Sequence, residues 1–115
     1  MAKRRHKYNA KKTERDGIVF DSKLEADRYS TLKLLLNAGE IRCLELQVPY
    51  PLDVNGVHIT TYFADFRYHD ETGAVVVEDS KGVQTPEFRL KKKLLLACHG
   101  VDLYVTGKND IISFG

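Results

Sequence analysis

The chain is poor in cysteine and proline, contains no tryptophan, and has no long apolar run. Its two cysteines, Cys43 and Cys98, show no CxxC spacing and have no clustered histidines nearby, which argues against a zinc site and favours buried, reduced thiols. No apolar run approaches membrane-spanning length, and the start, Met-Ala-Lys-Arg-Arg, lacks a hydrophobic signal region. We therefore expect the protein to stay in the cytoplasm where it is made.

Positive charge is concentrated at the beginning of the chain. Residues 1–16 carry seven basic and two acidic side chains, a net charge of +5, although the whole 115-residue chain carries only +2. We interpret 1–16 as a basic arm and 17–115 as a single domain with a modest core. Such an arm suits a polyanion such as nucleic acid, whereas the structural alternative is a solvated tail.

The pattern of apolar residues, caps and turns predicts two helices and several strands. Asp21 or Ser22 can cap the first helix, Gly39 can end it, and Pro49 and Pro51 are expected to end the strand that follows. The predicted elements are a short apolar segment at 17–20, a helix at 23–38, strands at 41–48, 57–68 and 74–81, a helix from 85 to 98 or 99, and strands at 101–106 and 111–114.

The order of these elements indicates an α/β fold with a mixed central sheet flanked by helices. A helix lies between the third and fourth strands, which permits a parallel crossover there. In that helix, Leu90, Leu94 and Ala97 are expected to face the core.

Acidic residues occur at unusual places in two of the predicted strands. Asp65 interrupts a run rich in aromatic residues, where aspartate is uncommon, and its structural alternative is a turn or cap acid. The run Glu78-Asp79-Ser80-Lys81 ends the apolar third strand. Residues two apart on a strand share a face, so Asp79 rather than Glu78 lies on the face of Lys81, where Asp65 can meet them. Two carboxylates and an amine around one point are the groups that metal-assisted phosphodiester cleavage needs.

The Asp-x-Lys spacing alone has little specificity, because the chain contains a second copy. Asp21-Ser22-Lys23 lies at a helix start, where the first two residues have a capping role. Asp79 and Lys81 instead end a buried strand, where charged groups need partners or a metal. Their structural alternative is a simple ion pair.

Glu25 has two compatible interpretations. Ser22-x-x-Glu25 matches a capping box. Glu25, Tyr29, Leu32 and Leu36 are also spaced by four, three and four, which places the carboxylate on an otherwise apolar face of the helix. A helix facing the sheet would direct this carboxylate toward the interior.

Basic residues on the second helix are candidate phosphate contacts. Arg89 and Lys93 lie four apart, and the helix begins a few residues after Lys81. The alternative is a solvated helix surface. The full set of candidate DNA contacts is Lys3, Arg4, Arg5, Lys7, Lys11, Lys12, Gln84, Arg89 and Lys93.

Taken together, these residues resemble the PD-(D/E)XK nuclease superfamily. The element order resembles its αβββαβ core. Asp65 matches the first acid, Asp79-x-Lys81 matches the (D/E)xK element, and Glu25 matches an acid that many members carry on the first helix. The chain departs from the pattern at Ala64, which stands where the superfamily's name has a proline. More closely, residues 17 to about 95 resemble a family of small phage-encoded endonucleases described as Holliday-junction-resolvase-like. The blocks that carry this resemblance are Gly17-Ile18-x-Phe20-Asp21-Ser22-x-x-Glu25, Leu46-Gln47-x-x-Tyr50, Tyr62-x-x-Asp65-Phe66 and Val77-Glu78-Asp79-x-Lys81-Gly82.

The resemblance implies a restriction-endonuclease-like fold and an Mg²⁺-dependent endodeoxyribonuclease, with Mn²⁺ as a substitute. Such an enzyme would act on branched or structured DNA in phage recombination or replication, in the bacterial or phage-infected host cytoplasm. The implied ligands are Asp65, Asp79 and the backbone carbonyl of Ser80, with Glu25 binding directly or through water. Lys81 would orient the attacking water or stabilise charge on the phosphate. Junction resolution usually needs a symmetric homodimer. The alternatives are a catalytically inactive DNA-binding protein that retains the fold, and a regulatory partner whose acidic cluster is a surface ion-pair network.

Overall fold

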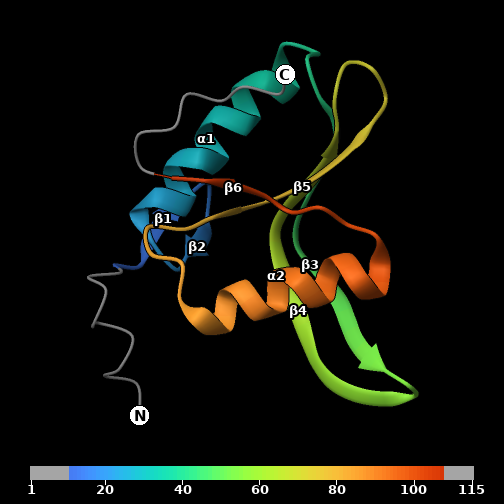
Figure 1. Ribbon diagram of the computed structural model, residues 1–115. Helices are drawn as coiled ribbons and strands as arrows, with labels where there is room; N and C mark the ends of the chain where they lie inside the picture. The colour runs from blue at the N-terminus through green and yellow to red at the C-terminus, as the bar shows by residue number, and fades with distance from the viewer. Residues whose placement is uncertain (1–10, 108–115) are drawn as a thin grey trace.

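The computed structural model describes residues 11–107, which form two helices and six strands (Figure 1). From the first helix onward the order is α, β, β, β, α, β, which confirms the predicted α/β class. No helix within residues 11–107 is long and apolar enough to cross a membrane. The elements are β1 (Thr13–Arg15), β2 (Ile18–Phe20), α1 (Lys23–Asn37), β3 (Arg42–Val54), β4 (Val57–His69), β5 (Val75–Ser80), α2 (Pro86–His99) and β6 (Tyr104–Thr106).

Local capping explains where both helices begin and how α2 ends. The Ser22 hydroxyl accepts a hydrogen bond from the Glu25 amide at 3.1 Å, so Ser22 is the N-cap of α1. The Thr85 hydroxyl accepts from the Phe88 amide in the same way at the start of α2. Gly100 ends α2 in the left-handed conformation, with φ of 69°. These boundaries agree with the sequence predictions to within a residue or two.

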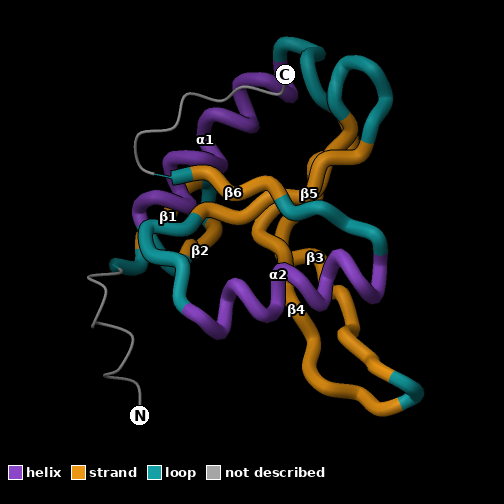
Figure 2. Tube along the Cα trace, in the orientation of Figure 1, coloured by secondary structure: helices purple, strands orange, loops and turns teal. Residues whose placement is uncertain are grey.

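The main sheet has four strands in the order β3-β4-β5-β6 (Figure 2). Strands β3, β4 and β5 pair antiparallel, whereas β6 pairs parallel to β5 after the crossover through α2. Strands β1 and β2 form a separate antiparallel pair. The β4–β5 register places Phe66 opposite Glu78, which brings Asp65 beside Asp79 at the end of this ladder.

The two helices cover opposite faces of the sheet. Neighbouring residues on β5 show this, because Val76 packs with the α1 cluster and Val77 belongs to the α2 cluster. Phe66 and Tyr68 lie under α1, whereas Leu52 and Tyr62, nearer the tip of the β3–β4 hairpin, lie with α2. The tip of this hairpin projects beyond α2 (Figure 1). Strand β5 is therefore buried on both faces, as its apolar sequence predicts.

The expectation that Pro49 and Pro51 end β3 is wrong, because the strand continues to Val54. Strand β3 lies at the edge of the sheet, where alternate amide groups point away from β4 and a missing N–H does not interrupt the ladder. Residues 13–15, predicted to belong to the basic arm, form β1 and pair with β2. The predicted strand at 111–114 lies outside the described residues.

Two predictions about burial also need correction. In α2 the buried side chains are Phe88 and Leu95, and Leu94 packs partly buried against their cluster, as predicted. In contrast, Leu90 is 58% exposed and Ala97 is exposed. The run of three leucines at 94–96 leaves the helical face ambiguous, and the aromatic ring of Phe88 decides which face packs on the sheet. Both cysteines are free, but Cys43 is exposed rather than buried.

Candidate active site

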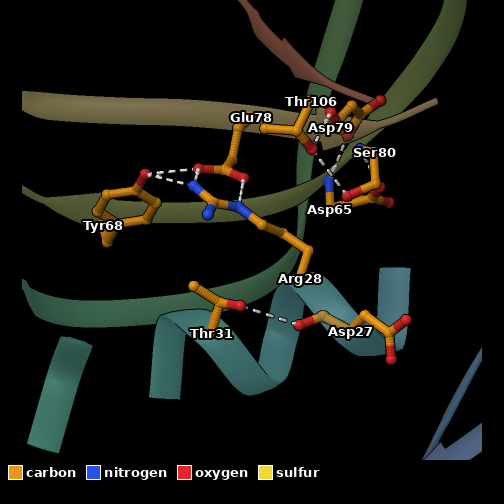
Figure 3. A network of polar contacts seen from close by, with 9 residues as sticks. All are labelled: Asp27, Arg28, Thr31, Asp65, Tyr68, Glu78, Asp79, Ser80 and Thr106. Atoms are coloured by element: carbon orange, nitrogen blue, oxygen red, sulfur yellow. Dashed lines mark hydrogen bonds and ion pairs between the residues drawn. The ribbon is translucent and has the colours of Figure 1, made fainter. Parts of the chain in front are cut away.

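Two hydrogen bonds join Asp65 on β4 to Asp79 and Ser80 on β5 (Figure 3). The Asp65 amide donates to Asp79 Oδ1 at 2.6 Å, and the Ser80 amide donates to Asp65 Oδ2 at 3.0 Å. The β4–β5 ladder ends at the preceding pair, Phe66 and Glu78, so the two carboxylates satisfy amide groups that the ladder no longer pairs. The predicted meeting of Asp65 and Asp79 is present.

Glu25 reaches the same place from the first turn of α1. Its side chain is buried, with 6% of its surface exposed. The Gln47 side-chain amide on β3 donates to Glu25 Oε2 at 3.2 Å and lies 3.4 Å from Asp65 Oδ1. Gln47 therefore connects two carboxylates that come from different elements. The Ser22 hydroxyl caps the helix at the Glu25 amide, while the Glu25 carboxylate lies with Gln47 and close enough to Asp65 and Asp79 for their charges to act on it.

Lys81 follows β5 directly and is half-buried beside the two aspartates. Its amide donates to the Thr106 carbonyl at 2.9 Å, which fixes the backbone against β6. Its ammonium lies 4.9 Å from the ring centroid of Phe88 in α2, within the range of a cation–π contact. The positive charge also lowers the pKa of both Asp65 and Asp79, in opposition to their burial.

Burial raises the pKa of all three carboxylic acids, and neighbouring carboxylates raise that of Glu25 further. Burial, followed by the charges of Asp65, Asp21 and Asp79, raises the pKa of Glu25 to about 8. Burial raises the pKa of Asp79 to about 6, against the opposing Asp65 amide and Lys81. Burial also raises the pKa of Asp65. An added cation would relieve this crowding of negative charge.

The donor set suits a hard divalent cation, because it consists of carboxylate oxygens. Within residues 11–107, however, no three His, Cys, Asp or Glu side chains are arranged as a group that could hold a metal ion. The Asp65 and Asp79 carboxylates are instead turned toward backbone amides. The chemistry of the residues fits Mg²⁺, and binding would require their side chains to reorient.

Residues 5–106 match a family described as "Protein of unknown function (DUF1064)". The chain belongs to the DUF1064 family. The DUF1064 match includes Glu25, Asp65, Asp79 and Lys81. No curated protein and no solved structure matches the chain. The assignment of a function to this DUF1064 protein therefore depends on the geometry and charges of its site.

The predicted DNA contacts of this DUF1064 protein fall into three groups. Lys11 and Lys12 are exposed, and Lys12 forms a 3.3 Å ion pair with Asp21. Gln84, Arg89 and Lys93 are exposed around the start of α2, the segment that follows Lys81. Lys3, Arg4, Arg5 and Lys7 lie outside the described residues.

Two residues of the DUF1064 site were missed by sequence reasoning. Gln47 has a left-handed backbone, with φ of 51°, which is uncommon for a residue other than glycine and often marks a functional position. Only the β3–β4 register reveals that it lies across from Asp65, since its neighbours Leu46 and Val48 pair with Phe66 and Ala64. Arg28 was missed because its partner Glu78 lies fifty residues away in the sequence.

Proposed function

We propose that the protein is a metal-dependent endonuclease that hydrolyses DNA phosphodiester bonds. The observation that carries this proposal is a convergence of four side chains from α1, β4 and the end of β5, next to the last pair of the β4–β5 ladder. These residues are Glu25, Asp65, Asp79 and Lys81. Metal-assisted phosphodiester hydrolysis uses carboxylates to bind the cation and a cationic side chain to stabilise phosphate charge. The cytoplasmic location expected from the sequence is compatible with a DNA substrate.

Each side chain has a distinct role in this proposal. Asp65, Asp79 and the Ser80 carbonyl would bind Mg²⁺, and Glu25 would complete the set directly or through water. When bound, the cation would activate a water and neutralise charge on the phosphate. Lys81 would orient the attacking water or bind a phosphate oxygen, and the Phe88 ring restrains its ammonium near the two aspartates. Since the carboxylates bind the cation in ionised form, binding would release protons from groups whose pKa is raised.

DNA would approach the site across the start of α2. Gln84, Arg89 and Lys93 are exposed there, directly after the segment that carries Lys81. The basic residues of the arm would add further phosphate contacts. On duplex DNA the logarithm of the binding constant should then fall with the logarithm of salt concentration by about 0.9 per phosphate neutralised. A branched substrate with two symmetric cuts would require a homodimer.

A cleavage assay on a panel of junction, flap, duplex and single-stranded DNA tests the proposal. The wild-type protein should cut at least one substrate with Mg²⁺ or Mn²⁺ and none with EDTA. Asp79→Asn and Lys81→Ala should each lower the rate by at least a hundredfold. The matched control is Lys23→Ala, which alters the second Asp-Ser-Lys tripeptide and removes only an exposed ion pair with Asp27. Equal cleavage by Lys81→Ala and Lys23→Ala would refute the assigned site.

The same panel separates this proposal from a DNA-binding protein without activity. That alternative predicts salt-dependent binding of DNA with no divalent-dependent cleavage of any substrate. An interaction protein whose acidic cluster forms surface ion pairs predicts no DNA binding even at low salt.

A further inference from the structure

A buried ion pair connects α1 to the strand that carries Asp79 (Figure 3). Arg28 of α1 donates from Nε to Glu78 Oε1 at 2.6 Å and from Nη2 to Glu78 Oε2 at 2.7 Å. The Tyr68 hydroxyl of β4 donates to Glu78 Oε2 at 2.5 Å. Glu78 is 0% exposed and Arg28 is 5% exposed. Three elements therefore meet at one carboxylate that solvent does not reach.

Stability alone does not account for this ion pair. Removing two charges from water costs free energy that their attraction often fails to recover, and apolar side chains of similar volume frequently serve as well or better. Arg28 Nη1 is also buried and has no hydrogen-bond partner among residues 11–107. What the bidentate arrangement provides, and apolar packing does not, is a fixed direction and distance between the two backbones.

The positions of the two partners in the chain indicate what this geometry serves. Arg28 lies one helical turn after Glu25, and Glu78 immediately precedes Asp79. Any shift of α1 along β5 would therefore change the placement of Glu25 relative to Asp79. We infer that Arg28, Glu78 and Tyr68 are positioning residues, which fix α1 on β5 so that the carboxylates of the candidate site face one another.

The inference rests on the proposed nuclease function for its activity readout only. A second readout needs neither metal nor DNA, because the Asp79 charge acts on Glu25 in the protein itself. Glu25→Gln changes the equilibrium constant of unfolding by one factor in the wild type and by another factor in Asp79→Asn. The ratio of these two factors measures the coupling between Glu25 and Asp79. At pH 8 without divalent cations, we expect this factor to be about three in the wild-type background.

The test variant combines Arg28→Met, Glu78→Met and Tyr68→Phe, which removes the three polar groups of the network together. The chain offers a matched control. Arg67 on β4 binds Glu45 on β3 through the same two atoms, Nε at 2.7 Å and Nη2 at 3.0 Å, and its Nη1 donates to the Tyr50 hydroxyl. This control pair is more exposed and connects strands rather than α1. The control variant is Arg67→Met, Glu45→Met and Tyr50→Phe.

We expect the test variant to fold, with a midpoint of thermal unfolding near that of the wild type. It should lose the coupling between Glu25 and Asp79, and it should cleave DNA at least tenfold more slowly at saturating Mg²⁺. The control variant should retain both coupling and cleavage. A folded test variant with undiminished coupling would overturn the inference, whether or not the wild type cuts DNA. Absence of cleavage by the wild type would instead count against the proposed function, and the coupling would still decide the positioning role.

A conservative single variant covers the case in which the triple variant does not fold. Arg28→Lys keeps the charge but replaces the bidentate contact with one ammonium. A positioning role predicts that this variant folds and loses at least half of the coupling. Full coupling in Arg28→Lys would show that charge alone is needed and would overturn the inference.

Discussion

Replacing Glu25 with glutamine should make the protein more stable at alkaline pH when no divalent cation is present. The pKa of Glu25 is raised from 4.5 to about 8 in the folded protein. Because the folded-state pKa lies above the unfolded one, ionisation penalises only the folded state. This penalty is absent below pH 4.5 and grows until the pH exceeds 8. Wild-type stability should therefore fall as pH rises through this interval, and Glu25→Gln should remove the part of the fall that Glu25 contributes. The raised pKa values of Asp79 and Asp65 account for the part that remains.

The size of the effect follows from the two pKa values. Between pH 5 and pH 8 they correspond to a loss of about 3 kcal/mol in the free energy of unfolding of the wild type. A domain of this size has a total stability of about 5 to 15 kcal/mol, so the difference is measurable. Urea unfolding followed by far-ultraviolet circular dichroism, in EDTA at several pH values, gives the required curves.

The control on the same helix is Asp27→Asn. The contribution of Asp27 to the free energy of unfolding changes with pH in the opposite direction to that of Glu25. Hydrogen bonds from Lys23 and Arg15 lower the pKa of Asp27, so this carboxylate contributes stability at neutral pH that is lost as pH falls. Parallel stability curves for the wild type and Glu25→Gln between pH 5 and pH 8 would show that Glu25 is not in a buried, negatively charged environment. That result would remove the electrostatic argument for a cation at this site.

Three further predictions concern the cation and its surroundings. In urea unfolding, Mg²⁺ at a concentration of ten times its dissociation constant should stabilise the wild type by about 1.4 kcal/mol and should not stabilise Asp79→Asn. Equal stabilisation of both proteins would contradict the assignment of Asp79 as a ligand. Gln47→Ala and Gln47→Gly should each weaken Mg²⁺ binding by about tenfold in calorimetry, and unchanged affinity would exclude a supporting role. The glycine variant should be about 1 kcal/mol more stable than the alanine variant, since glycine tolerates the left-handed backbone at this position. Phe88→Leu should lower the cleavage rate two- to fivefold, because the contact with Lys81 is lost, and should leave the Mg²⁺ affinity unchanged. A normal cleavage rate would show that the Phe88 ring does not restrain the Lys81 ammonium.

Features that depend on neighbouring residues were predictable from the sequence. Ser22, Thr85 and Gly100 mark helix boundaries through hydrogen bonds and backbone conformations that span only a few residues. The meeting of Asp65 and Asp79 was also predictable, because each lies at a recognisable point of an apolar strand.

Features that depend on partners distant in the chain were not predictable. The continuation of β3 through Pro49 follows from its place at the sheet edge, which the sequence does not state. The role of Gln47 emerges only from the register with β4, and the buried pair of Arg28 with Glu78 requires α1 to lie on β5. The spacing of the acidic residues indicated which of them would meet, but not which groups would keep them in place.

The prolines of β3 limit how copies of this protein can associate. The β3–β4 ladder persists through Pro49 and Pro51, so their missing N–H groups are on the side that faces away from β4. An incoming strand would find two alternate donors absent along this edge, which opposes both extension of the sheet and edge-to-edge aggregation. A homodimer that makes paired cuts in branched DNA would therefore be expected to assemble through a surface other than the part of the β3 edge that contains Pro49 and Pro51.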